Sequence, residues 1–108
     1  HELFAGIVNN PGYLDGIGSY AMFNSPRQLI LDEDDNLYIA DTENHVIRKI
    51  TPEGQVSTVI GQAGVAGYQD GDPETALFNR PHGVCINKEG IIYIADYENQ
   101  CIRRLAIE

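Results

Sequence analysis

The feature that most constrains this 108-residue sequence is that it repeats itself. Shifted by 55 positions, the chain aligns with itself without a gap, and 18 of the 53 aligned pairs are identical. The sequence therefore divides into repeat one, residues 1–55, and repeat two, residues 56–108, which together fill a single segment over 1–108. Two copies of one unit indicate modules that stack on each other and bury a continuous core between them.

Each repeat predicts four short β-strands. In repeat two the β-branched and aromatic residues gather over 56–61, 82–87, 91–96 and 101–107. Turn residues separate these segments, and the runs over 32–36 and 87–90 are typical of tight hairpins. Four antiparallel strands in a repeat of this length predict an all-β chain that forms two β-propeller blades.

The residues common to both repeats form one combined pattern. It reads Gly-Tyr-x-Asp-Gly, then Ala-x-Phe-Asn-x-Pro, then Tyr-Ile-Ala-Asp-x-Glu-Asn, and ends in Ile-Arg. This pattern resembles the NHL repeat, in the long form found in bacteria, and the resemblance covers nearly the whole chain. It implies a six-bladed propeller in which the strands after Pro26 and Pro81 line the central channel.

Two blades cannot close a six-bladed ring. We therefore expect three chains to complete it as a homotrimer, since two blades alone would leave apolar faces and open strand edges. Strand 1–6 is expected to act as the outer closing strand, beside a strand equivalent to 101–107 of its own or a neighbouring chain. The alternative is that the chain is a fragment of a longer propeller, or a minimal assembly, with no independent activity.

Three residues are candidates for a ligand-binding site at the channel mouth: Arg27, Arg80 and His82. Arginine side chains there could bind a carboxylate or phosphate, or pair with acidic groups of the next blade. His82 could bind zinc or another divalent metal if three copies converged on one axis. The α-amidating lyase propellers, which this segment resembles, carry Pro-His at the same point and use such histidines for zinc.

A second group recurs one repeat apart, and a set needed in every blade is typical of a structural role. Its members are Asp41, Asn44, Arg48, Asp96, Asn99 and Arg103. Asp15, Asp70 and Asp72 are interpreted as turn formers in Gly-rich crossover loops, and the Asp32–Asp35 run as a solvated hairpin tip. Cys85 and Cys101 stand where repeat one has aliphatic residues, so buried free thiols are expected.

The charge balance limits the partners. Sixteen acidic residues against seven basic ones give a net charge of −9, which disfavours nucleic acid and anionic membranes. No apolar run is long enough to insert into a membrane. With no nucleophile–base pair apparent, we expect a non-catalytic binding module for a protein, peptide or carbohydrate, without a cofactor. A metal-assisted lyase or hydrolase at His82 is the alternative, and the resemblance implies an extracytoplasmic location.

Overall fold

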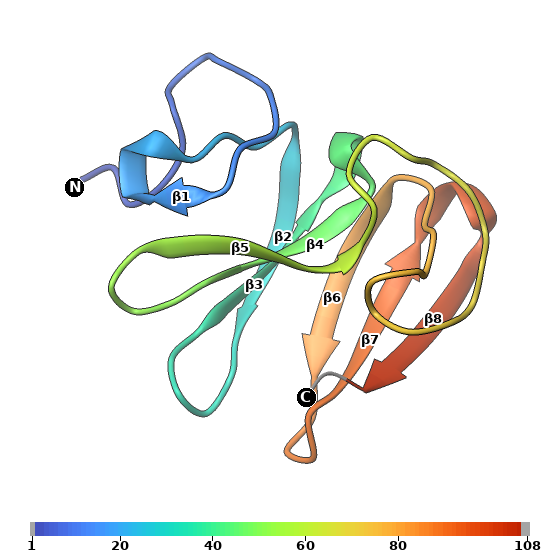
Figure 1. The fold of residues 1–108 in the computed structure, drawn as a ribbon. Coiled ribbons are helices and arrows are strands. Elements are labelled where there is room, and N and C mark those ends of the chain that lie inside the picture. Colours follow the sequence, from blue (N-terminus) through green and yellow to red (C-terminus); the bar gives the residue numbers. More distant parts are fainter. Residues whose placement is uncertain (1, 107–108) are drawn as a thin grey trace.

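The computed structural model describes residues 2–106 and consists of two antiparallel sheets stacked face to face (Figure 1). The first sheet, blade one, has the order β1-β5-β4-β3-β2. Its strands are β1 (Gly16–Ile17), β2 (Pro26–Leu31), β3 (Leu37–Asp41), β4 (Val46–Ile50) and β5 (Gln55–Gly61). The second sheet, blade two, contains β6 (Pro81–Ile86), β7 (Ile91–Asp96) and β8 (Cys101–Ala106) in that order. The all-β prediction is confirmed.

The blades are offset from the sequence repeats. Strand β5 carries residues of repeat two, yet it pairs with β4 and completes the four long strands of blade one. Blade two has three strands within the described residues, so the four strands expected of repeat two are divided between the blades. A long crossover over residues 62–80 connects β5 to β6.

The outer strand expected over residues 1–6 has no partner within this single chain, and its pairing with a neighbouring chain stays a prediction. Residues 2–6 adopt no strand, and His1 lies outside the described residues. The physical reason is the lack of an edge to pair with, because a strand at this place in the repeat hydrogen-bonds to the equivalent of β4 of a preceding unit. Gly6 instead donates its N–H to the carbonyl of Gly18.

The hairpins close as the sequence predicts. The carboxylate of Asp32 accepts hydrogen bonds from the backbone N–H groups of Asp34 and Asn36. In the second hairpin the Asn87 side chain accepts from Glu89 and Ile91 in the same way. Both loops are Asx-type turns, in which a side-chain oxygen replaces a backbone acceptor.

The main core lies between the blades. Blade one contributes Tyr38, Ala40, Ile47 and Ile60, and blade two contributes Val84, Ile92 and Ile94. Phe78 of the crossover fills the same layer and is fully buried. On the other side of blade one, residues from the 2–25 segment cover Ile39, Ile50 and Val56. Each crossover thus packs on the face of the blade that follows it.

The far face of blade two, on the side away from blade one, is open. Its residues Cys85, Tyr93, Ala95 and Ile102 are the repeat counterparts of Ile30, Tyr38, Ala40 and Ile47, all of which belong to the inter-blade core. Ile102 is 70% exposed, whereas its counterpart is fully buried. The expectation of buried thiols was wrong, since Cys85 is exposed and Cys101 is half-buried, although both are free.

Candidate functional site

An arginine fastens each crossover to its blade. The buried guanidinium of Arg48, on β4, donates from Nη1 to Asp41 Oδ2 at 2.6 Å and to the carbonyl of Met22 at 2.9 Å. Its Nη2 donates to the carbonyl of Leu14 and to Asp15 Oδ1, each at 2.9 Å. Arg103 on β8 repeats the arrangement with the loop of the second repeat.

The aspartate and asparagine of each repeat complete this network. Asp41 accepts the backbone N–H of Asn24 on Oδ1 and the amide of Asn44 on Oδ2. Asp96 and Asn99 do the same in blade two. All six recurrent side chains therefore make hydrogen bonds within the chain.

The crossover aspartates act differently from the turn-forming role expected of them. Asp15 and Asp70 accept hydrogen bonds from the two buried arginines. The arginines also lie against aromatic rings, Arg48 between Tyr13 and Phe23 and Arg103 between Tyr68 and Phe78, with guanidinium-to-ring distances of 4.4 to 4.7 Å. The tyrosine and the aspartate of each crossover therefore cover the guanidinium of the arginine that they contact.

The three candidate ligand-binding residues lie where the first strands of the two blades, β2 and β6, come together. We name this region the inner-edge site. It consists of Arg27, Glu43, Arg80, His82, Tyr97 and Glu98.

Arg80 connects the two blades at this site. Its guanidinium pairs with Glu43 of blade one and, at 3.2 Å, with Glu98 of blade two. Its backbone N–H donates to Nδ1 of His45 at 3.0 Å. Glu43 is the main reason that the pKa of Arg80 is raised above its ordinary value. Arg80 thus has the inter-blade ion pairs that the sequence left open as one of two roles.

His82 has a different environment. Its ring stacks on Tyr97 with 4.0 Å between centroids and an interplanar angle of 11°. Its Nε2 is buried and has no hydrogen-bond partner in the described part of the chain. Burial, followed by the positive charges of Arg27 and Arg80, lowers the pKa of His82, so the ring is neutral at pH 7.

Arg27 is the available cation of the inner-edge site. It is exposed, and none of the ion pairs among residues 2–106 involves it. Its charge is close enough to His82 to help lower the pKa of the imidazole. A ligand that carries a carboxylate can therefore pair with Arg27.

The described residues contain no group of three or more histidine, cysteine or acidic side chains placed to hold a metal ion. His82 has charged neighbours of both signs: Arg27 and Arg80 oppose the approach of a cation, whereas Glu98 and Glu43 favour it. Within residues 2–106, no helix has the length and apolar character needed to cross a membrane.

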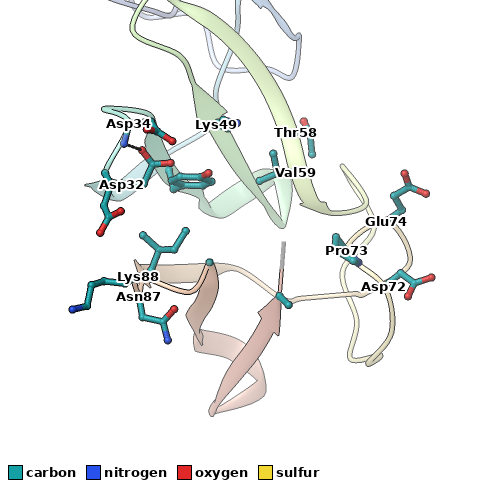
Figure 2. A pocket seen from close by; sticks show the side chains of 15 residues that line it. Asp32, Asp34, Lys49, Thr58, Val59, Asp72, Pro73, Glu74, Asn87 and Lys88 are labelled. Carbon is teal, nitrogen blue, oxygen red and sulfur yellow. Dashed lines mark hydrogen bonds between the residues drawn. The ribbon is translucent and has the colours of Figure 1, made fainter. Parts of the chain in front are cut away.

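A second depression lies at the opposite ends of the same strands (Figure 2). It has a volume of about 670 Å³ and lies between the blades, where the hairpins after β2 and β6 face the crossover. We name it the acidic groove. Its carboxylates are Asp32, Glu33, Asp34, Asp72 and Glu74, its lysines are Lys49 and Lys88, and apolar groups of Val59, Pro73 and Ile86 line it beside Tyr38.

Sequence reasoning missed several of these residues. Glu43 and Glu98 recur one repeat apart, but their shared arginine, Arg80, stands where repeat one has serine, so no repeated pair pointed to the contact. Gln28 accepts the backbone N–H of Val84 across the blades. Its counterpart is a glycine, and that asymmetry is the one signal that could have indicated a cross-blade contact.

Two stacked antiparallel blades with recurrent arginine-fastened crossovers define an all-β chain of the propeller type. Solved structures support this class. A structural genomics protein of unknown function from Bacteroides thetaiotaomicron matches 99% of this chain with 38% identity and a TM-score of 0.92. A protein with a provisional phosphatase name from the same species matches 98% with 28% identity and a TM-score of 0.86. An auxiliary nutrient binding protein, also from that species, matches 97% with 34% identity and a TM-score of 0.87. This chain covers 27%, 26% and 28% of theirs, respectively.

The particular family follows from the repeat. The family model named NHL repeat matches residues 78–105. NHL repeat-containing protein 2 of Gallus gallus is 39% identical over 77% of this chain, and SUPPRESSOR OF QUENCHING 1 of Arabidopsis thaliana is 30% identical over 82%. The chain spans 11% and 8% of the length of these two relatives. The chain belongs to the NHL-repeat family, and the resemblance seen in its sequence is confirmed.

Proposed function

We propose that the chain is a non-catalytic binding module whose inner-edge site takes a carboxylate-bearing peptide or carbohydrate. The observation that carries the proposal is an exposed Arg27 that has no acidic partner in the described residues and lies near His82. The nearby His82–Tyr97 stack adds a flat aromatic surface on which a sugar or peptide group can lie. The similar auxiliary nutrient binding protein supports a binding role in general.

The test is binding of acidic probes to the full chain. Galacturonate and an acetylated dialanine with a free carboxyl end are expected to bind, and galactose and the amide-capped dipeptide are not. Arg27→Gln should weaken binding of the acids about 10- to 150-fold, since a charge-assisted hydrogen bond contributes about 1.5–3 kcal/mol. Lys88→Gln, which removes the same charge far from the site, is the control. Equal binding of charged and uncharged probes would contradict the proposal.

Assembly into a ring is part of the proposal, because the channel needs blades on both sides. Support comes from the open far face of blade two, whose counterparts in blade one are buried by a following blade. Further blades can come from two more copies of this chain, which gives the homotrimer, or from the rest of a longer propeller. Chains that are three to four times longer in the similar solved structures favour the second source.

The outer edge of blade two supports this assembly as well. In blade one, the hydroxyl of Thr58 on β5 contacts both the Tyr13 hydroxyl and Asp15. Their counterparts Tyr68 and Asp70 face no such strand, and the Asp70 side chain is 77% exposed against 42% for Asp15. Tyr68 and Asp70 are thus placed to receive a fourth strand.

Residues 2–6 of another copy suit that edge, because they align with β5 in the repeat. Transfer of the β4–β5 register by 55 residues places Glu2 opposite Arg104, and opposite charges across a strand pair are favourable. The molar mass in solution tests this source of blades: three 11.9 kDa chains are expected for the trimer, and a monomer would refute it.

A metal-assisted lyase or hydrolase centred on His82 is the second candidate. The unsatisfied Nε2 favours it, whereas the neighbouring positive charges oppose it. Elemental analysis after incubation with zinc separates the two functions. One zinc per assembled site, lost in His82→Ala, would establish the metal, and its absence would remove this candidate. An extracytoplasmic location also belongs to the proposal, and cell fractionation tests it.

A further inference from the structure

The acidic groove is separate from the inner-edge site. Arg27 and His82 stand near the start of β2 and β6, whereas the groove is lined by the hairpins that follow the ends of these strands. Figure 2 shows Asp32, Asp34 and Lys88 on one side of the groove and Asp72 and Glu74 on the other. Between them lie apolar groups of both blades and of the crossover.

The carboxylates of the groove are not required by the repeat. Repeat one or repeat two has a neutral or basic residue at the corresponding position in four of the five cases. The pairs are Asp32 with Asn87, Glu33 with Lys88, Asp72 with Ile17 and Glu74 with Ser19. Residues that build every blade recur, so these acidic side chains belong to this groove and not to the blade as such.

The hairpin turn does not need the charge of Asp32. Asn87 makes the same two backbone contacts in the other hairpin with a neutral amide oxygen. Burial raises the pKa of Asp32, but hydrogen bonds from Asn36 and the N–H of Asp34 outweigh this and hold the pKa below its ordinary value. The carboxylate is therefore charged at neutral pH.

Apolar side chains line part of the groove, beside one phenol. Tyr38 is 4% exposed, and burial together with the charge of Asp32 raises its pKa to about 12. Its hydroxyl is thus protonated at pH 7. Val59, Pro73 and Ile86 beside it offer a surface for aliphatic carbon.

From this combination we propose that the acidic groove binds a basic peptide segment. Aliphatic parts of the segment lie on the apolar side chains between the blades, and lysine or arginine side chains pair with carboxylates on the two walls. Five carboxylates against two lysines give the groove an excess of negative charge that complements such a segment. Long basic side chains match the lining because they combine an aliphatic stem with a charged end.

The test uses the full chain and a fluorescently labelled hexapeptide of alternating leucine and lysine, with a leucine–glutamate hexapeptide for comparison. Fluorescence anisotropy should show binding of the lysine peptide that weakens as salt is added, and no binding of the glutamate peptide. A lysine peptide that fails to bind at millimolar protein concentration would overturn the proposal.

Two matched double variants locate the contact. Asp72→Asn with Glu74→Gln removes two charges from one wall, where neither side chain takes part in a hydrogen bond or ion pair among residues 2–106. This change should weaken the lysine peptide three- to tenfold. Asp35→Asn with Glu53→Gln removes two exposed charges outside the groove and should leave the affinity unchanged. Equal weakening by both variants would show a general charge effect and refute the groove.

Because the inner-edge site binds acids and the groove binds bases, failure of one proposal does not imply failure of the other. Arg27→Gln should leave the lysine peptide bound with the same affinity.

Discussion

At the scale of single residues, the guanidinium of Arg48 depends on a closely defined set of hydrogen-bond acceptors in blade one. Four acceptors surround it, and two of them are backbone carbonyls of the segment before β2. A lysine keeps the charge but offers one ammonium in place of a planar fork, so it cannot reach both carbonyls and both carboxylates. Asp41 would then be buried without its full set of donors.

We therefore expect Arg48→Lys to lower the free energy of unfolding by about 3 kcal/mol, the cost typical of a broken buried ion pair. Urea denaturation followed by circular dichroism measures the change. Arg104→Lys, at an exposed position of β8, should cost less than about 0.5 kcal/mol. A similar small loss in both variants would show that the fork geometry of Arg48 contributes little.

His82 gives the fold a pH dependence. Because the pKa of His82 in the folded chain lies below 6.5, the unfolded chain binds this proton more readily than the folded one. The contribution is fully favourable above pH 6.5 and declines as the pH falls from 6.5 toward the lowered pKa. In His82→Gln, the free energy of unfolding should fall less between pH 7 and pH 5 than in the unchanged chain. Identical pH profiles would contradict this.

Sequence reasoning at this scale worked best where the repeat supplied two examples. Asp41, Asn44 and Arg48 were interpreted as structural because they recur, and their contacts are all internal. It was weakest for residues that occur once. The ion pairs of Arg80 depend on two glutamates from different blades. Nothing in a linear sequence shows that positions 43 and 98 meet at one side chain.

At the scale of elements, the end of β5 shows how closely a strand and a crossover fit. Gly61 has a φ of +97°, and a Cβ there would lie 2.8 Å from the carbonyl oxygen of His45. Gly64, three residues later, has a φ of +77° with open space around the same position. The two glycines share the left-handed backbone conformation, but only at Gly61 would an added Cβ meet neighbouring atoms.

Substitution of these two glycines by alanine separates the cost of backbone strain from the cost of a steric clash with neighbouring atoms. Gly64→Ala should cost about 1 kcal/mol for backbone strain alone, and Gly61→Ala about 2 kcal/mol more because β4 must move. Thermal or chemical denaturation of the two variants measures the difference. Equal losses would mean that the strand adjusts freely to the added methyl group.

The strands themselves were largely predictable, because short β-branched runs and Asx turns are local signals. The outer strand over 1–6 stays a prediction, since its formation depends on a neighbouring edge and not on its own composition. The position of β5 was likewise not a local property, because by sequence alone β5 belongs to repeat two. Hydrogen bonding to β4, a non-local property, places it in blade one.

At the scale of the whole molecule, the far face of blade two decides how the chain associates. If further blades cover it, Ile102 becomes buried like its counterpart Ile47. Ile102→Glu would then place an uncompensated charge in an apolar interface. If those blades come from other copies of this chain, we expect this variant to remain folded but to lose the mass of the assembly in light scattering. Val65→Glu, at an exposed position of the crossover, is the control and should assemble as before. Loss of assembly in neither variant would refute a role for this face.

The stacking of two blades was predictable from the repeat, since identical units bury equivalent faces. The acidic groove was not, because its walls come from a hairpin of each blade and from the crossover, and it exists only after all three are brought together.

The offset between blades and repeats determines where the chain can be divided without splitting a strand. A cut between residues 55 and 56 would divide a strand that belongs to one sheet, whereas a cut within residues 62–66 leaves the strands of both sheets intact. A duplication or deletion of 55 residues, wherever it begins, removes or adds one strand of every type and so preserves blade order. Propellers of this kind can therefore gain or lose blades without a precise genetic breakpoint.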